Sequence, residues 1–198
     1  MRWLTLYLRS RGAPAALTGA VGCTALMWTL WSVSSKERTV GVQMVVLTVL
    51  FLVALLTASF GGPDDALDRT AALRWAPRRA AHLLAAVAVV VGLLLLTLGT
   101  DAGFGPAWLV VRDAGGLLGL TALGAVVLGP ARSWFLPLGW TLPATMFPQS
   151  EPLVGRVLTW QTQEPASTAA AVLAGVLALA GLVAYASAGP APRAPAEA

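Results

Sequence analysis

Long apolar stretches alternate with short polar ones along almost the whole chain. A helix of about twenty apolar residues spans the ~30 Å hydrocarbon core of a bilayer. Five stretches have that length, and a sixth is shorter and contains Pro137 and Pro143. The pattern therefore predicts an all-α, polytopic membrane protein with about six transmembrane helices. The predicted spans are Pro14–Val33, Val40–Phe60, Ala81–Gly99, Pro106–Gly129, Ser133–Pro148 and Thr168–Ala188.

Residues 13–188 are expected to form one six-helix transmembrane domain. Residues 1–12 precede it as a short amphipathic segment whose basic side carries Arg2, Arg9 and Arg11. Such a segment either lies in the headgroup plane or simply leads into the first span. Residues 149–167 are predicted to be an external amphipathic segment, and the Pro/Ala-rich tail 189–198 is expected to be disordered.

Composition supports a membrane protein. Hydrophobic residues make up 57% of the 198 residues and charged residues 11%, against about 25% charged residues in soluble domains. The formal net charge is +4, but the arginines lie in loops between apolar stretches, so nucleic-acid binding is not expected. Cys23 is the single cysteine, which excludes an intramolecular disulfide. Met1–Gly12 lacks the long apolar run of a removable signal peptide.

The distribution of basic residues predicts the orientation. Cytoplasmic loops of membrane proteins carry an excess of lysine and arginine. With six spans, nine arginines fall on the side of both termini, and Lys36, Arg38, Arg112 and Arg156 fall on the other side. We therefore expect a multi-pass protein of the cell membrane, with the N- and C-termini in the cytoplasm. The nine are Arg2, Arg9, Arg11, Arg69, Arg74, Arg78, Arg79, Arg132 and Arg193.

The longest polar interval, Gly61–Ala80, is then a cytoplasmic loop. Pro63 suits a first helical position, and Pro77 is expected to end the helix. Three aspartates come early and arginines later, which complements the helix dipole. The loop is either a solvated connector or a docking helix for a soluble partner. The candidate docking residues are Asp64, Asp65, Asp68, Arg69 and Arg74.

The fourth span carries the other candidate residues. Arg112 and Asp113 lie about one turn inside it, and charges in a membrane helix usually face the protein interior or water. They either sit at interfacial depth or line a polar pathway near the outer face. Gly115 and Gly119 form a GxxxG pattern, which allows close helix packing within the chain or across a dimer.

No enzyme is expected. The sequence has no GxxxxGK[ST] motif, so it is not a self-contained ATPase. His82 is the only histidine and has no cysteine partner for a zinc site. A magnesium site at the three aspartates is disfavoured by the interleaved Arg69. No catalytic residue, metal or cofactor is therefore predicted.

The order of elements resembles the membrane subunits of exporter-type ABC transporters. The matching elements are the amphipathic segment Met1–Gly12, six spans, a coupling helix at Pro63–Ala76 and short external helices at Gln149–Glu164. The resemblance implies a separate ATPase subunit bound at the cytoplasmic loop, and a homo- or heterodimer of permeases. It also implies that Arg112 and Asp113 lie near the transport pathway.

Two other classes remain open. A non-catalytic membrane protein of structural, scaffolding or immunity type needs only the apolar spans and a basic loop. A secondary transporter would be supported by inverted repeats and buried ionisable pairs. Neither of these two features is visible in the sequence, although Asp113 would be its natural proton-carrying carboxylate.

Overall fold

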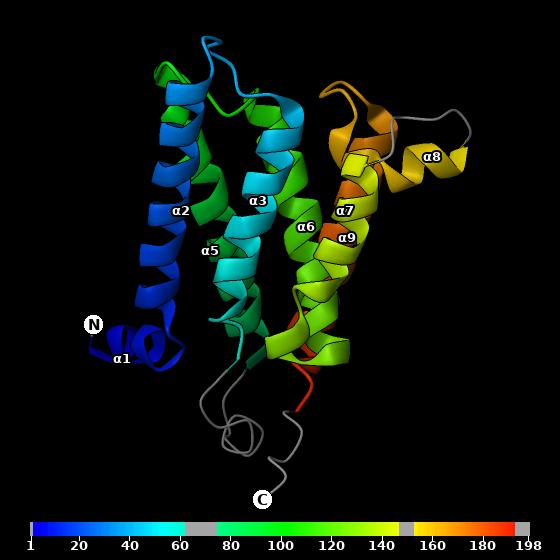
Figure 1. Ribbon diagram of the computed structural model, residues 1–198. Helices are drawn as coiled ribbons and strands as arrows, with labels where there is room; N and C mark the ends of the chain where they lie inside the picture. The colour runs from blue at the N-terminus through cyan, green and yellow to red at the C-terminus, as the bar shows by residue number, and fades with distance from the viewer. Residues whose placement is uncertain (1, 62–74, 147–152, 193–198) are drawn as a thin grey trace, which may run out of the picture.

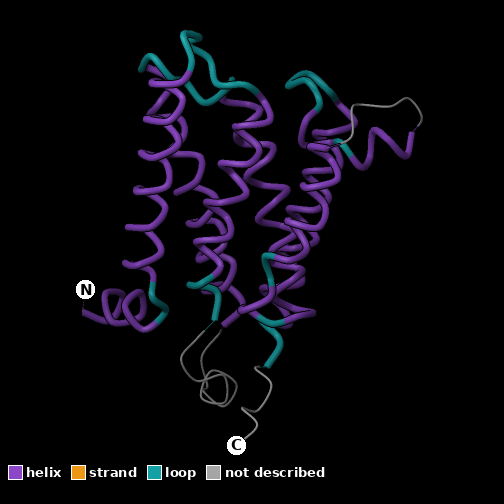
Figure 2. The backbone as a smooth tube through the Cα atoms, in the orientation of Figure 1, coloured by secondary structure: helices purple, strands orange, loops and turns teal. Residues whose placement is uncertain are grey.

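The computed structural model describes residues 2–61, 75–146 and 153–192, and these form a bundle of helices with no β-strand (Figures 1 and 2). The all-helical fold class is thus confirmed for the described residues. Within the described residues, four helical segments are long and apolar enough to cross a membrane, whereas six were predicted. They are Ala13–Ser34 (α2), Trp75–Gly99 (α5, Trp75–Leu95, continued by the 3₁₀ helix η1, Leu96–Gly99), Ala107–Leu128 (α6) and Thr168–Ala188 (α9).

The two remaining apolar segments form shorter helices. The second predicted span is α3, Val42–Thr57, of 16 residues, and the fifth is α7, Phe135–Met146, of 12 residues. At 1.5 Å per residue these helices are about 24 Å and 18 Å long. The prolines do not break α7: Pro137 lies in its first turn and Pro143 lies inside it.

The helices alternate in direction (Figure 1). The start of α2 and the end of α9 lie at one end of the bundle, where α1 (Arg2–Ser10) lies across the start of α2. Gly12, with φ of 67°, makes the sharp turn between these two helices, a backbone conformation that glycine adopts without steric cost. We call this the terminal end, and the other the opposite end.

At the opposite end, two loops are joined through their backbones. Thr39 and Gly103 form an isolated parallel bridge, with Val40 N donating to Gly103 O at 2.8 Å and Gly103 N donating to Arg38 O at 2.9 Å. The short helices α8 (Leu153–Leu158) and η3 (Trp160–Thr162) also lie at this end, with α8 running out sideways (Figure 1). At the terminal end, the 3₁₀ helix η2 (Pro130–Arg132) links α6 to α7.

Helix α6 forms the core of the bundle. Its most apolar 18-residue window is 72% buried, against 17–28% for the other three long segments, because α3, α5, α7 and α9 all pack against it. The tightest approach is to α9. A Cβ at Gly119 would lie 2.6 Å from Ala178 Cα, and a Cβ at Gly181 would lie 2.6 Å from Gly119 Cα. Neither position has room for a side chain, so the two backbones touch.

The structure corrects one helix boundary. Pro77 does not end a helix over Pro63–Ala76, because α5 already begins at Trp75 and contains Pro77 in its first turn. Proline is tolerated there, since the first-turn N–H groups have no partner within the helix. Arg78 and Arg79 therefore belong to α5. The rest of the predicted coupling helix lies outside the described residues.

The contact between α6 and α9 generates a prediction. Changing Gly119→Ala should lower the free energy of unfolding by about 1–3 kcal/mol, because overpacking a tight contact costs that much. Thermal unfolding in detergent measures the effect. Gly175→Ala on α9 is the matched control, since a Cβ there meets no atom within 4 Å. Equal melting temperatures for the two variants would contradict the close contact.

Candidate functional site

The structure brings the two charged residues of α6 into a buried polar cluster at the opposite end. Helix α6 starts directly after Pro106, which places Arg112 and Asp113 in its second turn. Arg112 is 3% exposed and Asp113 is fully buried. The side chains pair: Arg112 Nε donates to Asp113 Oδ1 at 2.8 Å. Each charge therefore has a partner of the opposite sign.

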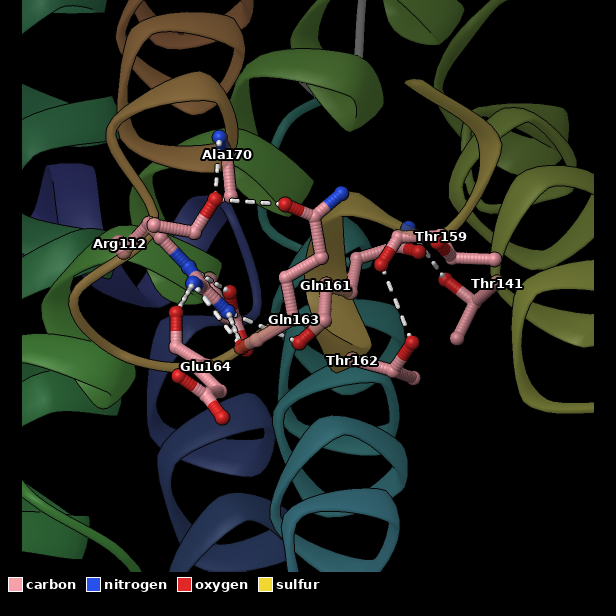
Figure 3. Close-up of polar contacts among 10 residues, drawn as sticks. Arg112, Thr141, Thr159, Gln161, Thr162, Gln163, Glu164 and Ala170 are labelled. Carbon is pink, nitrogen blue, oxygen red and sulfur yellow. Dashed lines mark hydrogen bonds and ion pairs between the residues drawn. The ribbon is translucent and has the colours of Figure 1, made fainter. Parts of the chain in front are cut away.

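The remaining nitrogens of Arg112 hold the chain segment that precedes α9 (Figure 3). Nη2 donates to the backbone carbonyls of Gln161 at 2.9 Å and Gln163 at 3.1 Å. Nη1 donates to the carbonyls of Glu164 at 3.0 Å and Gln163 at 3.2 Å. One guanidinium thus holds three backbone carbonyls, one in η3 and two in the stretch between η3 and α9. Its planar fork of five N–H donors suits this task in a way that a lysine does not.

Trp160 packs the same segment onto α6. Its side chain is fully buried, and it lies against Gly116, one turn after Arg112. A Cβ at Gly116 would come within 2.9 Å of Trp160 Cζ3. The indole can approach the helix this closely only because Gly116 has no side chain.

Side chains from α7 and α9 complete the cluster. Trp140 Nε1 donates to Leu158 O at 3.1 Å, and Gln161 Nε2 donates to Thr141 Oγ1 at 3.2 Å. Gln163 Nε2 donates to the carbonyl of Arg156, and Gln163 Oε1 accepts from Ser167 Oγ at 2.6 Å.

Ser167 is also the N-cap of α9. Its Oγ accepts from the backbone N–H of Ala170 at 3.3 Å, which satisfies one of the free donors at the start of that helix. The segment 159–167 is thereby tied to α6, α7 and α9 together.

Three buried polar atoms of this cluster have no hydrogen-bond partner among the described residues. They are Asp113 Oδ2, Gln161 Oε1 and Trp160 Nε1. A buried polar group without a partner costs about 1–3 kcal/mol, so the cluster is stabilised less than its bonded atoms suggest. The part of the chain that the structure describes holds no group of three or more histidine, cysteine, aspartate or glutamate residues able to bind a metal.

The other predicted site residues lie elsewhere. Asp64, Asp65, Asp68, Arg69 and Arg74 fall outside the described residues. They belong to the stretch between the end of α3 and the start of α5, and both of these helix ends lie at the terminal end (Figure 1). Gly119 lies at the contact with α9. A Cβ at Gly115 would meet Ala178 Cβ at 3.8 Å, which is ordinary contact.

Sequence reasoning missed a second buried cluster, at the terminal end. Arg11 is 5% exposed and does not belong to a headgroup-facing basic side of α1. Its Nη1 donates to Phe60 O at 3.3 Å, and its guanidinium lies 5.0 Å from the Tyr7 ring centroid. Tyr185 Oη donates to the same Phe60 carbonyl at 2.7 Å. The end of α3 is therefore held from α1 and from α9.

His82 belongs to this second cluster. Its Nε2 lies 3.0 Å from Ser59 Oγ, and its ring meets Phe60 and Tyr7 edge-on. The periodicity of apolar positions could not reveal this cluster, because the groups that Arg11 and Tyr185 recognise are backbone carbonyls.

Comparison with known proteins does not assign this arrangement to a family: no family model matches the chain, and neither curated proteins nor solved structures include a significant match.

The Arg112 cluster generates a prediction. Changing Arg112→Gln should destabilise the protein by about 3–5 kcal/mol, because it leaves the Asp113 carboxylate buried without its counter-charge. Hydrogen exchange should rise first in residues 159–167, whose carbonyls lose their donor. Arg38→Gln is the control, since its pair with Asp101 is 3.7 Å long and both side chains are 84% exposed. Exposed pairs of this kind contribute about 0–1 kcal/mol. Unchanged exchange in 159–167 would contradict the proposed anchoring.

Proposed function

We propose that this chain is the membrane subunit of a transporter whose ATPase is a separate protein. The observation that carries the proposal is the arrangement at the terminal end. There α1 lies across the start of α2, at the same end of the bundle as the end of α3 and the start of α5, which flank residues 62–74 (Figure 1). A soluble ATPase that binds this end could contact α1 and the polar loop at once.

Two further features support the proposal. Short helices precede the last long helix at the opposite end, where the resemblance to exporter permeases expects external helices. The absence of an ATP-binding motif in the sequence fits a subunit that obtains its energy from a partner. Helices α2, α5, α6 and α9 are long and apolar enough to hold the subunit in a bilayer.

The proposed orientation places the terminal end in the cytoplasm. Arginines of α1, of the first turn of α5 and of η2 lie at this end. At the opposite end Lys36, Arg38 and Arg156 are exposed, while Arg112 is buried against the chain. The excess of basic residues at the terminal end favours a cytoplasmic location by the positive-inside rule.

Cysteine labelling tests the orientation. In a Cys23→Ala background, Lys36→Cys should react with a membrane-impermeant maleimide added to intact cells. Ser10→Cys should react only after the cells are permeabilised. Both positions are exposed, so accessibility within the protein does not separate them. The reverse labelling pattern would overturn the orientation.

Co-purification tests the partner. An ATPase should accompany the tagged protein from its native membrane, and it should be lost when Asp64, Asp65 and Asp68 are all changed to lysine. Asp101→Lys is the control, because this exposed aspartate lies at the opposite end. If the triple variant still co-purified with the ATPase, the three aspartates of the loop would not be needed for the contact with the ATPase. No ATPase in any sample would overturn the proposal in favour of a non-catalytic membrane protein.

A further inference from the structure

An apolar groove of about 770 Å³ runs along the side of the bundle. Its floor is α3, and its walls are α2 on one side and η2 with the start of α7 on the other. The volume lies in the range of about 300–1,000 Å³ that is usual for small-molecule sites. The lining residues are Cys23, Met27, Phe51, Ala54, Leu55, Thr57, Ala58, Pro130, Ala131 and Trp134.

The groove extends from the terminal end to the middle of the bundle. Ala58 and Ala131 line it beside the ends of α3 and α6, whereas Cys23 and Phe51 lie near the midpoints of α2 and α3. In a bilayer of ~30 Å hydrocarbon thickness, this is the depth covered by the fatty-acyl chains of one leaflet.

The chemistry of the lining fits an acyl chain. The lining side chains are apolar apart from the hydroxyl of Thr57, the indole N–H of Trp134 and the thiol of Cys23. The hydroxyl of Thr57 donates to the carbonyl of Ala54 at 2.6 Å, and Trp134 Nε1 donates to the carbonyl of Ala131 at 3.2 Å. The groove therefore presents little hydrogen-bonding capacity to a polar solute. A flexible hydrocarbon chain needs none.

A free cation lies at the terminal end of the groove. Arg132 directly follows Pro130 and Ala131 of the lining and is exposed, and its side chain has no ion pair or hydrogen bond with the described residues. Trp134 of the lining stacks on Phe135, with ring centroids 4.2 Å apart, and aromatic side chains favour the headgroup level of a membrane. An unneutralised arginine beside an apolar groove matches an anionic headgroup attached to an acyl chain.

We propose that this groove binds one acyl chain of an anionic phospholipid from the leaflet at the terminal end, with Arg132 contacting the lipid phosphate. The charge of Arg132 favours an anionic lipid over a zwitterionic one. The proposal depends on insertion in a membrane and not on a transport function, so it is tested without an ATPase.

Cys23 provides the measurement, because it is the only cysteine and lines the deep part of the groove. The rate of its reaction with a small maleimide is followed on the full chain in detergent, with phosphatidylglycerol or phosphatidylcholine added. Phosphatidylglycerol should slow the reaction at a concentration about fivefold lower than phosphatidylcholine, as expected from one basic residue near an anionic group.

Variants of the protein distinguish the contribution of the lipid headgroup to binding from that of the acyl chain. Arg132→Gln should abolish the preference for phosphatidylglycerol, Arg132→Lys should keep most of it, and Arg38→Gln at the opposite end should leave it unchanged. Ala58→Trp, at an exposed position of the groove, should remove protection by both lipids. Melting temperatures show that each variant is folded.

Two outcomes would overturn the proposal. Equal protection by the two lipids in the unaltered protein would mean that the groove holds ordinary bilayer lipid without selection. Protection that rises with protein concentration in the absence of added lipid would mean that a second copy of the chain covers the groove.

Discussion

The backbone contact between α6 and α9 is the constraint on which the rest of the bundle depends. In lipid, apolar helices gain little by hiding apolar surface from one another, so their association relies on close packing. Gly119 and Gly181 permit that packing, because a Cβ at either position would overlap the other helix. Once α9 is fixed against α6, Ser167 and the preceding segment are brought to Arg112. At the other end of α9, Tyr185 reaches the Phe60 carbonyl.

The two buried arginines use the same chemistry at the two ends of the bundle. Arg112 and Arg11 each donate to backbone carbonyls at a point where the chain leaves or has not yet entered a helix. Carbonyls outside a helix need donors, and water is scarce within a membrane protein. The arginines supply these donors from a neighbouring element. The two arginines thereby hold these segments in place with side-chain hydrogen bonds in place of the backbone hydrogen bonds of a longer helix.

The hydropathy pattern predicted the long helices well and their contacts poorly. The last span, Thr168–Ala188, coincides with α9, and the fourth agrees with α6 to within a residue at each end. The start of α5 was wrong because Pro77 was interpreted as the end of a helix, although proline fits a first turn equally well. That Arg112 faces the protein interior or water followed from the cost of charge in a membrane. Its partners did not, because every residue has a carbonyl and only the fold decides which ones come near. For the same reason the contact between Gly116 and Trp160, which lies 44 positions later in the sequence, could not be predicted.

Helix α7 has a consequence for the lipid around it. The helix exposes four large apolar side chains, those of Phe135, Leu136, Leu142 and Met146. Its 12 residues, however, extend only about 18 Å. The apolar surface of α7 is therefore shorter than the hydrocarbon core of an ordinary bilayer is thick. Lipid accommodates such a mismatch by local thinning, at a fraction of a kcal/mol per ångström. In a bilayer, the lipid around such a helix is therefore expected to be thinnest beside α7, and the protein is expected to favour membranes built from shorter lipids.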